Sequence, residues 1–353
     1  MTTHTIGLVG CGHISVTHLK AWKKLTNCEV RGVFDLNQEL AAKRAQEFAV
    51  PKIYTDLNEL IADCDVLDVC TPPQTHAKIA QQIIAAGKNL VIEKPLVTNV
   101  ADWEMLLAAL ETSPSKIAIV HNLKYSAGIQ QAKKWVDAGK IGRIISIQNE
   151  FLTSPNHDRM LVGNSHWSHR LPGGRWFETM PHQLYLTHYF GGNLKFTSVS
   201  SLHTNAATPG APADEVLVTL KNEHSTATIH FSSNCEQNQR TLVLQGTEGK
   251  ITVDLLSSYA ALSTQRDSKS SRAIGGKIAL DAGQLVLTWL PNRAQYALNQ
   301  IQGETPHAAI IRTFARYLDG QGEAPTPLDE IDYVVRNGDL IGRAIDESVK
   351  CPA

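Results

Sequence analysis

The sequence lacks a long apolar run, a basic leader and any large excess of charge. No stretch approaches eighteen consecutive apolar residues, and no basic segment followed by an apolar run opens the chain, so we expect neither membrane insertion nor secretion. Lys and Arg number 33 against 34 Asp and Glu, a formal net charge of −1. That balance gives no reason to expect nucleic acid or an acidic membrane as a partner. Together these absences predict a cytoplasmic protein.

Metal-binding cysteine patterns are also missing. The six cysteines show no CxxC or similar spacing, and several lie in apolar strand contexts. They are therefore interpreted as reduced core residues rather than disulfides or metal ligands. The five histidines that come closest to a cluster lack supporting Cys or paired acids, and no metal is predicted there. They are His157, His166, His169, His182 and His188.

What is present has the composition of an ordinary globular protein. The chain has 353 residues, of which 42% are hydrophobic and 19% charged, and this length predicts about two domains.

A glycine turn near the start predicts a phosphate-binding site. The apolar run Thr5–Val9 is followed by Gly10-Cys11-Gly12, and a helical pattern extends over 13–24. Gly10 lets the chain reverse, and Gly12 has no side chain to keep a pyrophosphate from the backbone. The N–H groups of the helix start, with His13 and Ile14, then face the anion. The alternative is an ordinary glycine turn.

Asp35 follows a second strand over 29–34, about twenty residues on, where a ribose-binding carboxylate belongs. A carboxylate there accepts hydrogen bonds from the ribose diol and repels a 2′-phosphate. Leu36 and Asn37 supply no compensating charge, although Arg44 on the next helix is a candidate. NAD is therefore favoured over NADP.

Up to residue 122, strands and helices alternate. This pattern predicts a Rossmann domain over 1–122, a doubly wound parallel sheet in an α/β arrangement. Ligands bind beyond the carboxyl ends of such strands. The segments that reach those ends are Asp35, Thr71-Pro72-Pro73, Glu93-Lys94-Pro95 and His121-Asn122.

After residue 122 the strand signals lose their intervening helices. We expect strands over 144–151, 196–203, 215–220, 226–232, 241–245 and 250–255, then helices over 307–318 and 328–348. Consecutive strands with short links predict an α+β domain over 123–353 with a large, mostly antiparallel sheet. More strands than covering helices, together with the resemblance given next, predict a homodimer or homotetramer.

These motifs resemble the glucose-fructose oxidoreductase/inositol dehydrogenase (Gfo/Idh/MocA) family. The similarity rests on four motifs: Gly10-Cys11-Gly12, Thr71-Pro72-Pro73 with His76, Glu93-Lys94-Pro95, and His121-Asn122-Leu123-Lys124-Tyr125. The resemblance covers nearly the whole chain and implies a nicotinamide-dependent dehydrogenase of sugars, inositols or sugar nucleotides. It also implies that Lys94 reaches the reacting hydroxyl, beside a cis proline bond. Cofactor contacts are expected from Thr71, Pro72, His76, Glu93, Lys94 and Asn122, and a substrate contact from Tyr125.

The family's second landmark is Asp-x-Gly-x-His-x-x-Asp on a helix after a Gly-Gly turn. Here Glu178 stands in place of the first Asp, Met180 in place of the Gly and Tyr185 in place of the last Asp, while His182 is retained. Glu178 and His182 lie one helical turn apart on the same face.

Oxidising a carbinol requires a hydride acceptor and a base for the hydroxyl proton. Histidine suits the base, and a lysine beside the oxygen stabilises developing alkoxide charge. We therefore assign Lys94 and His182 to catalysis, with Glu178 orienting one of them. The alternative makes Lys94 solvated and His182 a surface residue.

The segment 156–176 is rich in His and Arg, with Asp158 as its one acid. It is interpreted either as a lid that binds a carboxylate or phosphate on a sugar, or as a solvated loop. The substrate contacts expected from the lid are His166, His169, Arg170 and Arg175.

Two other functions remain open at this point. One is a glycosidase that uses tightly held NAD for transient oxidation. The other is a regulatory protein that senses NAD(H) without turnover.

Overall fold

The computed structural model describes residues 3–158, 160–161, 166–204, 213–264 and 304–350, and the single residues 283, 294 and 298. The chain forms two compact units. The first comprises residues 1–122 and 304–336, and the second comprises 123–303 and 337–353. The sequence-based division had assigned 304–336 to the second domain; these residues instead pack with the first 122.

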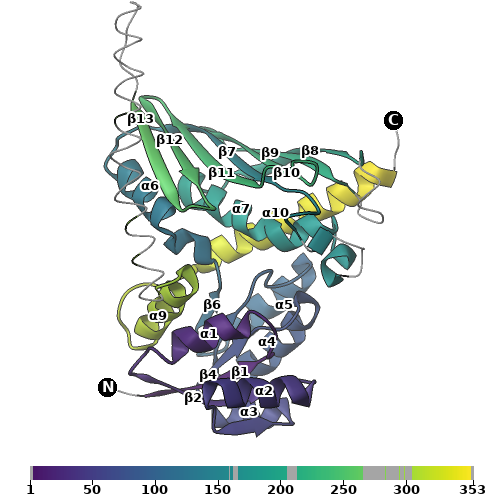
Figure 1. Cartoon of the computed structure of the whole chain (residues 1–353), viewed down its shortest axis with the longest axis vertical. Helices are drawn as coiled ribbons and strands as arrows, with labels where there is room; N and C mark the ends of the chain where they lie inside the picture. The colour runs from purple at the N-terminus through teal and green to yellow at the C-terminus, as the bar shows by residue number, and fades with distance from the viewer. Residues whose placement is uncertain are drawn as a thin grey trace, which may run out of the picture. The chain divides into compact units, whose positions relative to one another are not determined.

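The first unit contains a six-stranded parallel sheet in the order β3-β2-β1-β4-β5-β6 (Figure 1). This confirms the predicted doubly wound fold. Its strands are β1 (His4–Val9), β2 (Cys28–Phe34), β3 (Lys52–Tyr54), β4 (Val66–Val69), β5 (Asn89–Ile92) and β6 (Ile117–Ile119).

Helices connect the successive parallel strands. They are α1 (Ser15–Trp22), α2 (Gln38–Phe48), α3 (Leu57–Asp63), α4 (His76–Ala85) and α5 (Val100–Glu111), with a 3₁₀ turn over Pro73–Thr75 before α4. A core cluster joins α3, α4 and α5 to the sheet and includes Ile331 and Val335. Those two residues belong to α10 (Leu328–Lys350), and α9 (Pro306–Leu318) packs on α1.

Local sequence explains several helix starts. The Asn37 side chain accepts hydrogen bonds from the N–H groups of Glu39 and Leu40 at the start of α2, and Asn99 does the same for Asp102 in α5. Such caps satisfy N–H groups that have no partner within the helix.

The second unit contains a seven-stranded sheet in the order β13-β12-β11-β7-β10-β9-β8. All neighbours are antiparallel except β7 and β10, which confirms the mostly antiparallel prediction. The strands are β7 (Ile144–Leu152), β8 (Lys195–Leu202), β9 (Glu215–Lys221), β10 (Thr226–Ser232), β11 (Gln239–Gly246), β12 (Gly249–Asp254) and β13 (Tyr259–Thr264). The sequence had not predicted β13.

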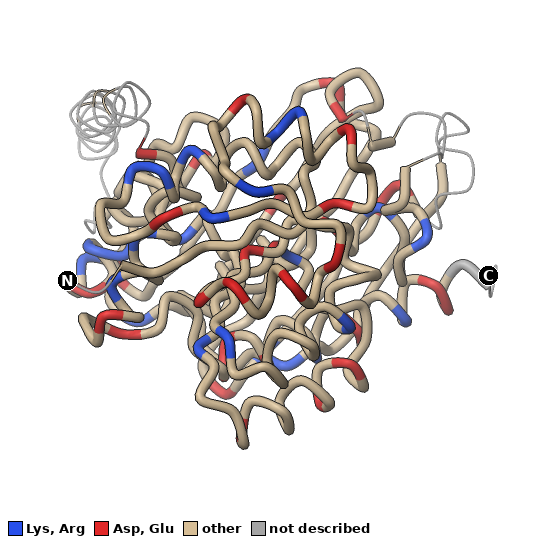
Figure 2. The backbone as a smooth tube through the Cα atoms, turned by 90° about the horizontal axis from the view of Figure 1, so that it is seen from below, with Lys and Arg blue, Asp and Glu red and all other residues tan. Residues whose placement is uncertain are grey.

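Helices α6 (Ala127–Asp137) and α7 (Arg175–Gly191) pack on one face of this sheet (Figure 1). The residues that β9 and β10 direct to this face, among them Val218 and Ile229, are fully buried. Acidic and basic residues are interspersed along the backbone of the described residues (Figure 2). Within the described residues, no helix is both long and apolar enough to cross a membrane.

Candidate active site

Gly10 and Gly12 perform different tasks in the turn after β1. Gly10 has φ +93°, and a Cβ there would lie 2.9 Å from the backbone carbonyl carbon of Cys70. A Cβ on Gly12 would meet nothing within 4 Å. Gly10 is therefore needed for the fold, whereas Gly12 presents bare backbone to open space, as close approach of a pyrophosphate requires.

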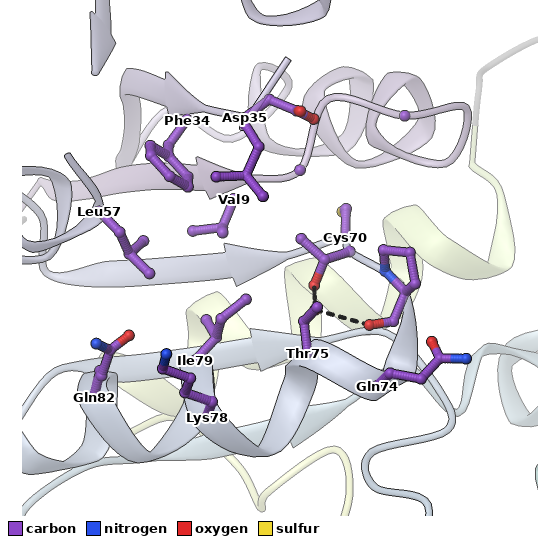
Figure 3. Close-up of a pocket in the computed structure, with 15 residues that line it drawn as sticks. Val9, Phe34, Asp35, Leu57, Cys70, Gln74, Thr75, Lys78, Ile79 and Gln82 are labelled. Atoms are coloured by element: carbon purple, nitrogen blue, oxygen red, sulfur yellow. Dashed lines mark hydrogen bonds between the residues drawn. The ribbon is translucent and has the colours of Figure 1, made fainter. Parts of the chain in front are cut away.

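A cavity of about 550 Å³ opens beside this turn. Figure 3 shows Asp35 at the end of β2 on one side, with Lys78 and Gln82 of α4 on the other. Of the predicted cofactor residues, the lining includes Gly10, Gly12, Asp35, Thr71 and Pro72. The sequence had not predicted Phe34, Leu57, Gln74, Thr75, Lys78, Ile79 or Gln82. The apolar and polar groups together fit an adenosine moiety with its ribose at Asp35.

Asp35 is held rigidly at the rim. Its carboxylate accepts hydrogen bonds from the backbone N–H of Cys11 at 2.7 Å and of Asn37 at 2.8 Å. Arg44, the candidate counter-charge, donates to the carbonyl oxygens of Cys11 and Gly12 and pairs with Glu47. Arg44 therefore braces the glycine turn.

Two motifs at the strand ends are linked by His76, whose ring is completely buried. Nε2 lies 2.7 Å from the carbonyl oxygen of Thr71, and Nδ1 lies 2.8 Å from that of Pro95. The Lys94-Pro95 peptide bond is cis, as the family resemblance implies. His76 thus acts within the protein and lies outside the cavity lining.

Glu93 belongs to a buried charge network behind the lysine. The His18 ring binds Asp68 through Nδ1 at 2.9 Å and Glu93 through Nε2 at 3.0 Å. Trp22 Nε1 donates to Asp68 at 2.6 Å, and Glu93 Oε2 accepts the backbone N–H of Lys94 at 3.1 Å. The network therefore fixes the peptide that carries Lys94.

Burial opposes charge on these groups, and for His18 and Glu93 the neighbouring groups reverse the effect on the pKa. For His18, burial favours the neutral ring, but the charges and hydrogen bonds of Asp68 and Cys70 together outweigh it and raise the pKa well above its ordinary value. For Glu93, burial is outweighed by the hydrogen bond and charge of His18, which lower the pKa to about 2. Burial lowers the pKa of His307 to about 4. His18 is thus an imidazolium between two carboxylates.

The same atoms form two groups with metal-ligand composition, His18–Asp68–Cys70 and His18–Glu93–His307, each within 4.8 Å. Protons on both nitrogens of His18 already satisfy the carboxylates, so we read the network as an ion-pair cluster.

Other predicted residues of the first unit lie around this network. Asn122 is buried, with its amide nitrogen 3.3 Å from the ring nitrogens of His307. Lys94 is half-buried at the end of β5, while His13 is exposed and Ile14 half-buried just before α1.

In the second unit, α7 carries His182 and its partner. Nδ1 of His182 lies 2.8 Å from the hydroxyl of Tyr185, which also accepts the backbone N–H of Leu123 at 2.9 Å. Tyr185 is fully buried. It stands where the family motif has an acid, and its hydroxyl contacts the His182 ring.

Arg175 and Glu178 form an internal ion pair. The buried Arg175 guanidinium donates to Asp158 at 2.7 Å and to Glu178 at 2.9 Å, and it also contacts Thr179 Oγ1. We had expected Arg175 to bind a substrate anion; its donors instead bind protein carboxylates, because Asp158 folds back onto α7.

The remaining residues of the His/Arg-rich segment are dispersed. His166 Nδ1 lies 2.9 Å from Ser168 Oγ, and His169 Nε2 lies 2.5 Å from the carbonyl oxygen of Met160. Arg170 is exposed, and Tyr125 is half-buried. Arg159 lies outside the described residues.

Comparison with known proteins agrees with this architecture. Residues 4–121 match the oxidoreductase family with an NAD-binding Rossmann fold, and residues 129–252 match the GFO/IDH/MocA C-terminal domain. The chain belongs to the Gfo/Idh/MocA family. It is therefore an oxidoreductase, and NAD is its cofactor.

Named relatives of this Gfo/Idh/MocA protein include dehydrogenases. An oxidoreductase of Formosa agariphila is 25% identical over 264 residues, 73% of this chain and 81% of that protein. Levoglucosan dehydrogenase of Pseudarthrobacter phenanthrenivorans is 30% identical over 162 residues, 43% of this chain and 42% of that enzyme. The crystal structure of the WlbA dehydrogenase from Bordetella pertussis, in complex with NADH and UDP-GlcNAcA, matches with TM-score 0.80 and 18% identity, covering 98% of this chain and 96% of that one. The last likeness establishes the fold.

In this family member the catalytic assignments fall into separate units. Lys94 lies in the first unit, and His182 and Glu178 lie in the second. The contacts of Lys94 are therefore described within the first unit, and those of Glu178 and His182 within the second.

Sequence reasoning missed the network around His18 and the contact between Tyr185 and His182. Asp68 carries a usable signal, since an acid inside an otherwise apolar strand requires a buried partner. His307 had no comparable sequence signal, because it follows the other network residues in the chain by more than two hundred positions.

Proposed function

We propose that this chain oxidises a hydroxyl group of a sugar or sugar derivative with NAD, using Lys94 and His182 as acid–base groups. The observation that carries the proposal is the histidine on α7 oriented through Nδ1 by a buried tyrosine hydroxyl. Family membership and the named levoglucosan dehydrogenase relative support a sugar-like substrate.

The first unit supplies the cofactor site. Gly12 admits the pyrophosphate, and Asp35 accepts hydrogen bonds from the ribose. When bound, NAD supplies a hydride acceptor. Asp35, held by two backbone N–H groups, disfavours an added 2′-phosphate, so we propose that NAD is preferred over NADP.

Lys94 and His182 divide the remaining work. The Lys94 ammonium group holds the hydroxyl oxygen and stabilises negative charge that develops on it. With Nδ1 turned to Tyr185, Nε2 of His182 is the nitrogen assigned to receive the hydroxyl proton. Glu93, bonded to the Lys94 peptide, fixes the lysine's backbone.

A substrate screen tests this function. The full chain with NAD is incubated with neutral hexoses, inositols, uronates, sugar phosphates and aryl glycosides, and NADH, oxidised sugar and released aglycone are quantified. Equal amounts of both products support the proposal, and the same assay with NADP measures cofactor preference. Aglycone release without net NADH would instead indicate a glycosidase, and NADH binding without any turnover would indicate a sensor.

A further inference from the structure

Arg240 is a guanidinium whose donors the described protein leaves unused. It lies on β11 directly opposite Phe151 of β7, with its guanidinium carbon 4.3 Å from the centre of the Phe151 ring. Its Nε is buried and has no hydrogen-bond partner in the described part of the chain. Among the residues placed by the structure, no carboxylate lies within ion-pair distance of it.

Arg175 lies beside the same Phe151 ring, but its guanidinium donors are hydrogen-bonded. Its guanidinium carbon lies 5.9 Å from the centre of Phe151, and its donors bind Asp158, Glu178 and Thr179. The two nearby carboxylates are therefore already bound to Arg175. The four charged groups balance, but Arg240 lacks hydrogen-bond acceptors.

The electrostatic setting agrees with this difference. Burial, followed by the charge of Arg175, lowers the pKa of Arg240, and Asp158 and Glu178 offset this only in part. A buried donor without an acceptor is costly unless a ligand supplies one, and Nε of Arg240 is such a donor within the described part of the chain.

We propose that Arg240 binds an oxyanion substituent of the substrate, a carboxylate or a phosphate, through its paired N–H groups. Arginine matches the two oxygens of such groups in a fork geometry. This inference rests on the proposed sugar dehydrogenase function and names the substrate class of that site.

The position of Arg240 suits that task. Trp176 of α7 packs edge-on against Phe151, so Arg240 and Phe151 lie on the sheet face that α7 covers. Glu178, which interacts electrostatically with Arg240, lies one helical turn before His182. Arg240 is thus on the same side of the second unit as the histidine assigned the proton transfer.

His166, which interacts electrostatically with Arg175 and Glu178, offers a second, neutral donor. Burial and the charge of Arg175 lower its pKa, so its ring is neutral at physiological pH. Nδ1 accepts the backbone N–H of Ser168 at 3.3 Å, which leaves the ring proton on Nε2.

The test uses D-glucuronate, D-glucose 6-phosphate and D-glucose as probes of the full chain saturated with NADH. Binding is measured by thermal shift and calorimetry, so that turnover is not required. Arg240→Met keeps an unbranched apolar stem over Phe151, Arg240→Lys keeps the charge without the fork, and Arg143→Met removes an exposed arginine of the same unit as the matched control.

We expect the wild type to bind glucuronate or glucose 6-phosphate more tightly than glucose, and the stronger of the two identifies the oxyanion. Arg240→Met should weaken that binding about 10- to 100-fold, with a smaller loss for Arg240→Lys. Glucose binding, NADH affinity and the Arg143→Met variant should be unchanged. Without sugar, Arg240→Met should melt close to the wild type, because it removes a buried N–H that has no acceptor in the described part of the chain.

Equal wild-type affinity for all three probes, or undiminished oxyanion binding by Arg240→Met, would overturn the inference. The proposed function fails separately. Oxyanion binding that depends on Arg240, without reduction of NAD by any sugar, would contradict the dehydrogenase and leave the Arg240 site standing. Reduction of NAD by neutral sugars with no effect of Arg240→Met would support the dehydrogenase and contradict the Arg240 site.

Discussion

His18 holds a charge in the core because two carboxylates face its two ring nitrogens. Its raised pKa stabilises the fold fully below its ordinary value near 6.5, and this contribution is lost as pH rises through the folded pKa. Glu93, lowered from 4.5 to about 2, contributes stability above 4.5 that is lost as pH falls towards 2. His307, lowered from 6.5 to about 4, costs stability as pH falls from 6.5 to 4, because the unfolded state binds its proton first.

Stability should therefore peak near pH 6–7 and decline on both sides. In His18→Gln the alkaline decline should largely disappear, and the free energy of unfolding at neutral pH should fall by about 3–5 kcal/mol, since a buried ion pair loses one partner. Urea unfolding from pH 4 to 10 measures both, with exposed His13→Gln as the control. An unchanged pH profile in His18→Gln would contradict the ionised network.

The Tyr185 hydroxyl oxygen contacts both the backbone N–H of Leu123 and Nδ1 of His182, so one substitution tests its contribution to stability and its proposed role in catalysis. In Tyr185→Phe the partly buried N–H of Leu123 loses its acceptor, which should lower the free energy of unfolding by about 1–3 kcal/mol. The His182 ring also loses its orienting contact, so kcat should fall while NADH affinity stays unchanged. Tyr333→Phe, whose buried hydroxyl the structure also places in the core, provides a comparison that should leave kcat intact. Unaltered kcat in Tyr185→Phe would remove the orienting role.

At the scale of elements, the turn from β1 to α1 separates folding from cofactor binding. Gly12→Ala meets no atom within 4 Å and has an ordinary backbone, so it should unfold like the wild type and yet bind NADH more weakly. Gly10→Ala is strained at φ +93° and meets the Cys70 backbone, so it should lower the melting temperature. Calorimetry and thermal unfolding separate the two effects. Wild-type NADH affinity in Gly12→Ala would argue against pyrophosphate approach at this turn.

The same turn was predictable because its signal is local. Gly10, Gly12 and Asp35 follow from spacing within thirty residues, and the strand ends follow from β-α alternation. The sequence did not predict that Asp158 pairs with Arg175 and not with Arg240. That choice depends on where the segment containing Asp158 and strand β11 lie in the folded chain. The assignment of 304–336 to the first unit likewise depends on packing of α9 on α1, which no local pattern encodes.

At the scale of the whole molecule, we expect a homodimer or homotetramer. On β8 and β9, Leu202 and Leu217 are 59% and 42% exposed, on the sheet face opposite the helices. Leu217→Asp should shift the mass measured by light scattering at micromolar concentration towards the monomer. Leu40→Asp, at an exposed leucine of α2, should not. A wild-type monomer would refute the expectation.

The most direct test of the dehydrogenase assignment compares Lys94→Met and His182→Gln with the wild type on the best substrate from the screen. Kinetics give kcat, and calorimetry gives NADH affinity. If Lys94 and His182 serve the chemical step, each variant should lose about 100- to 10,000-fold in kcat while NADH affinity is retained. Wild-type kcat in either variant would contradict the account of how this chain oxidises its substrate.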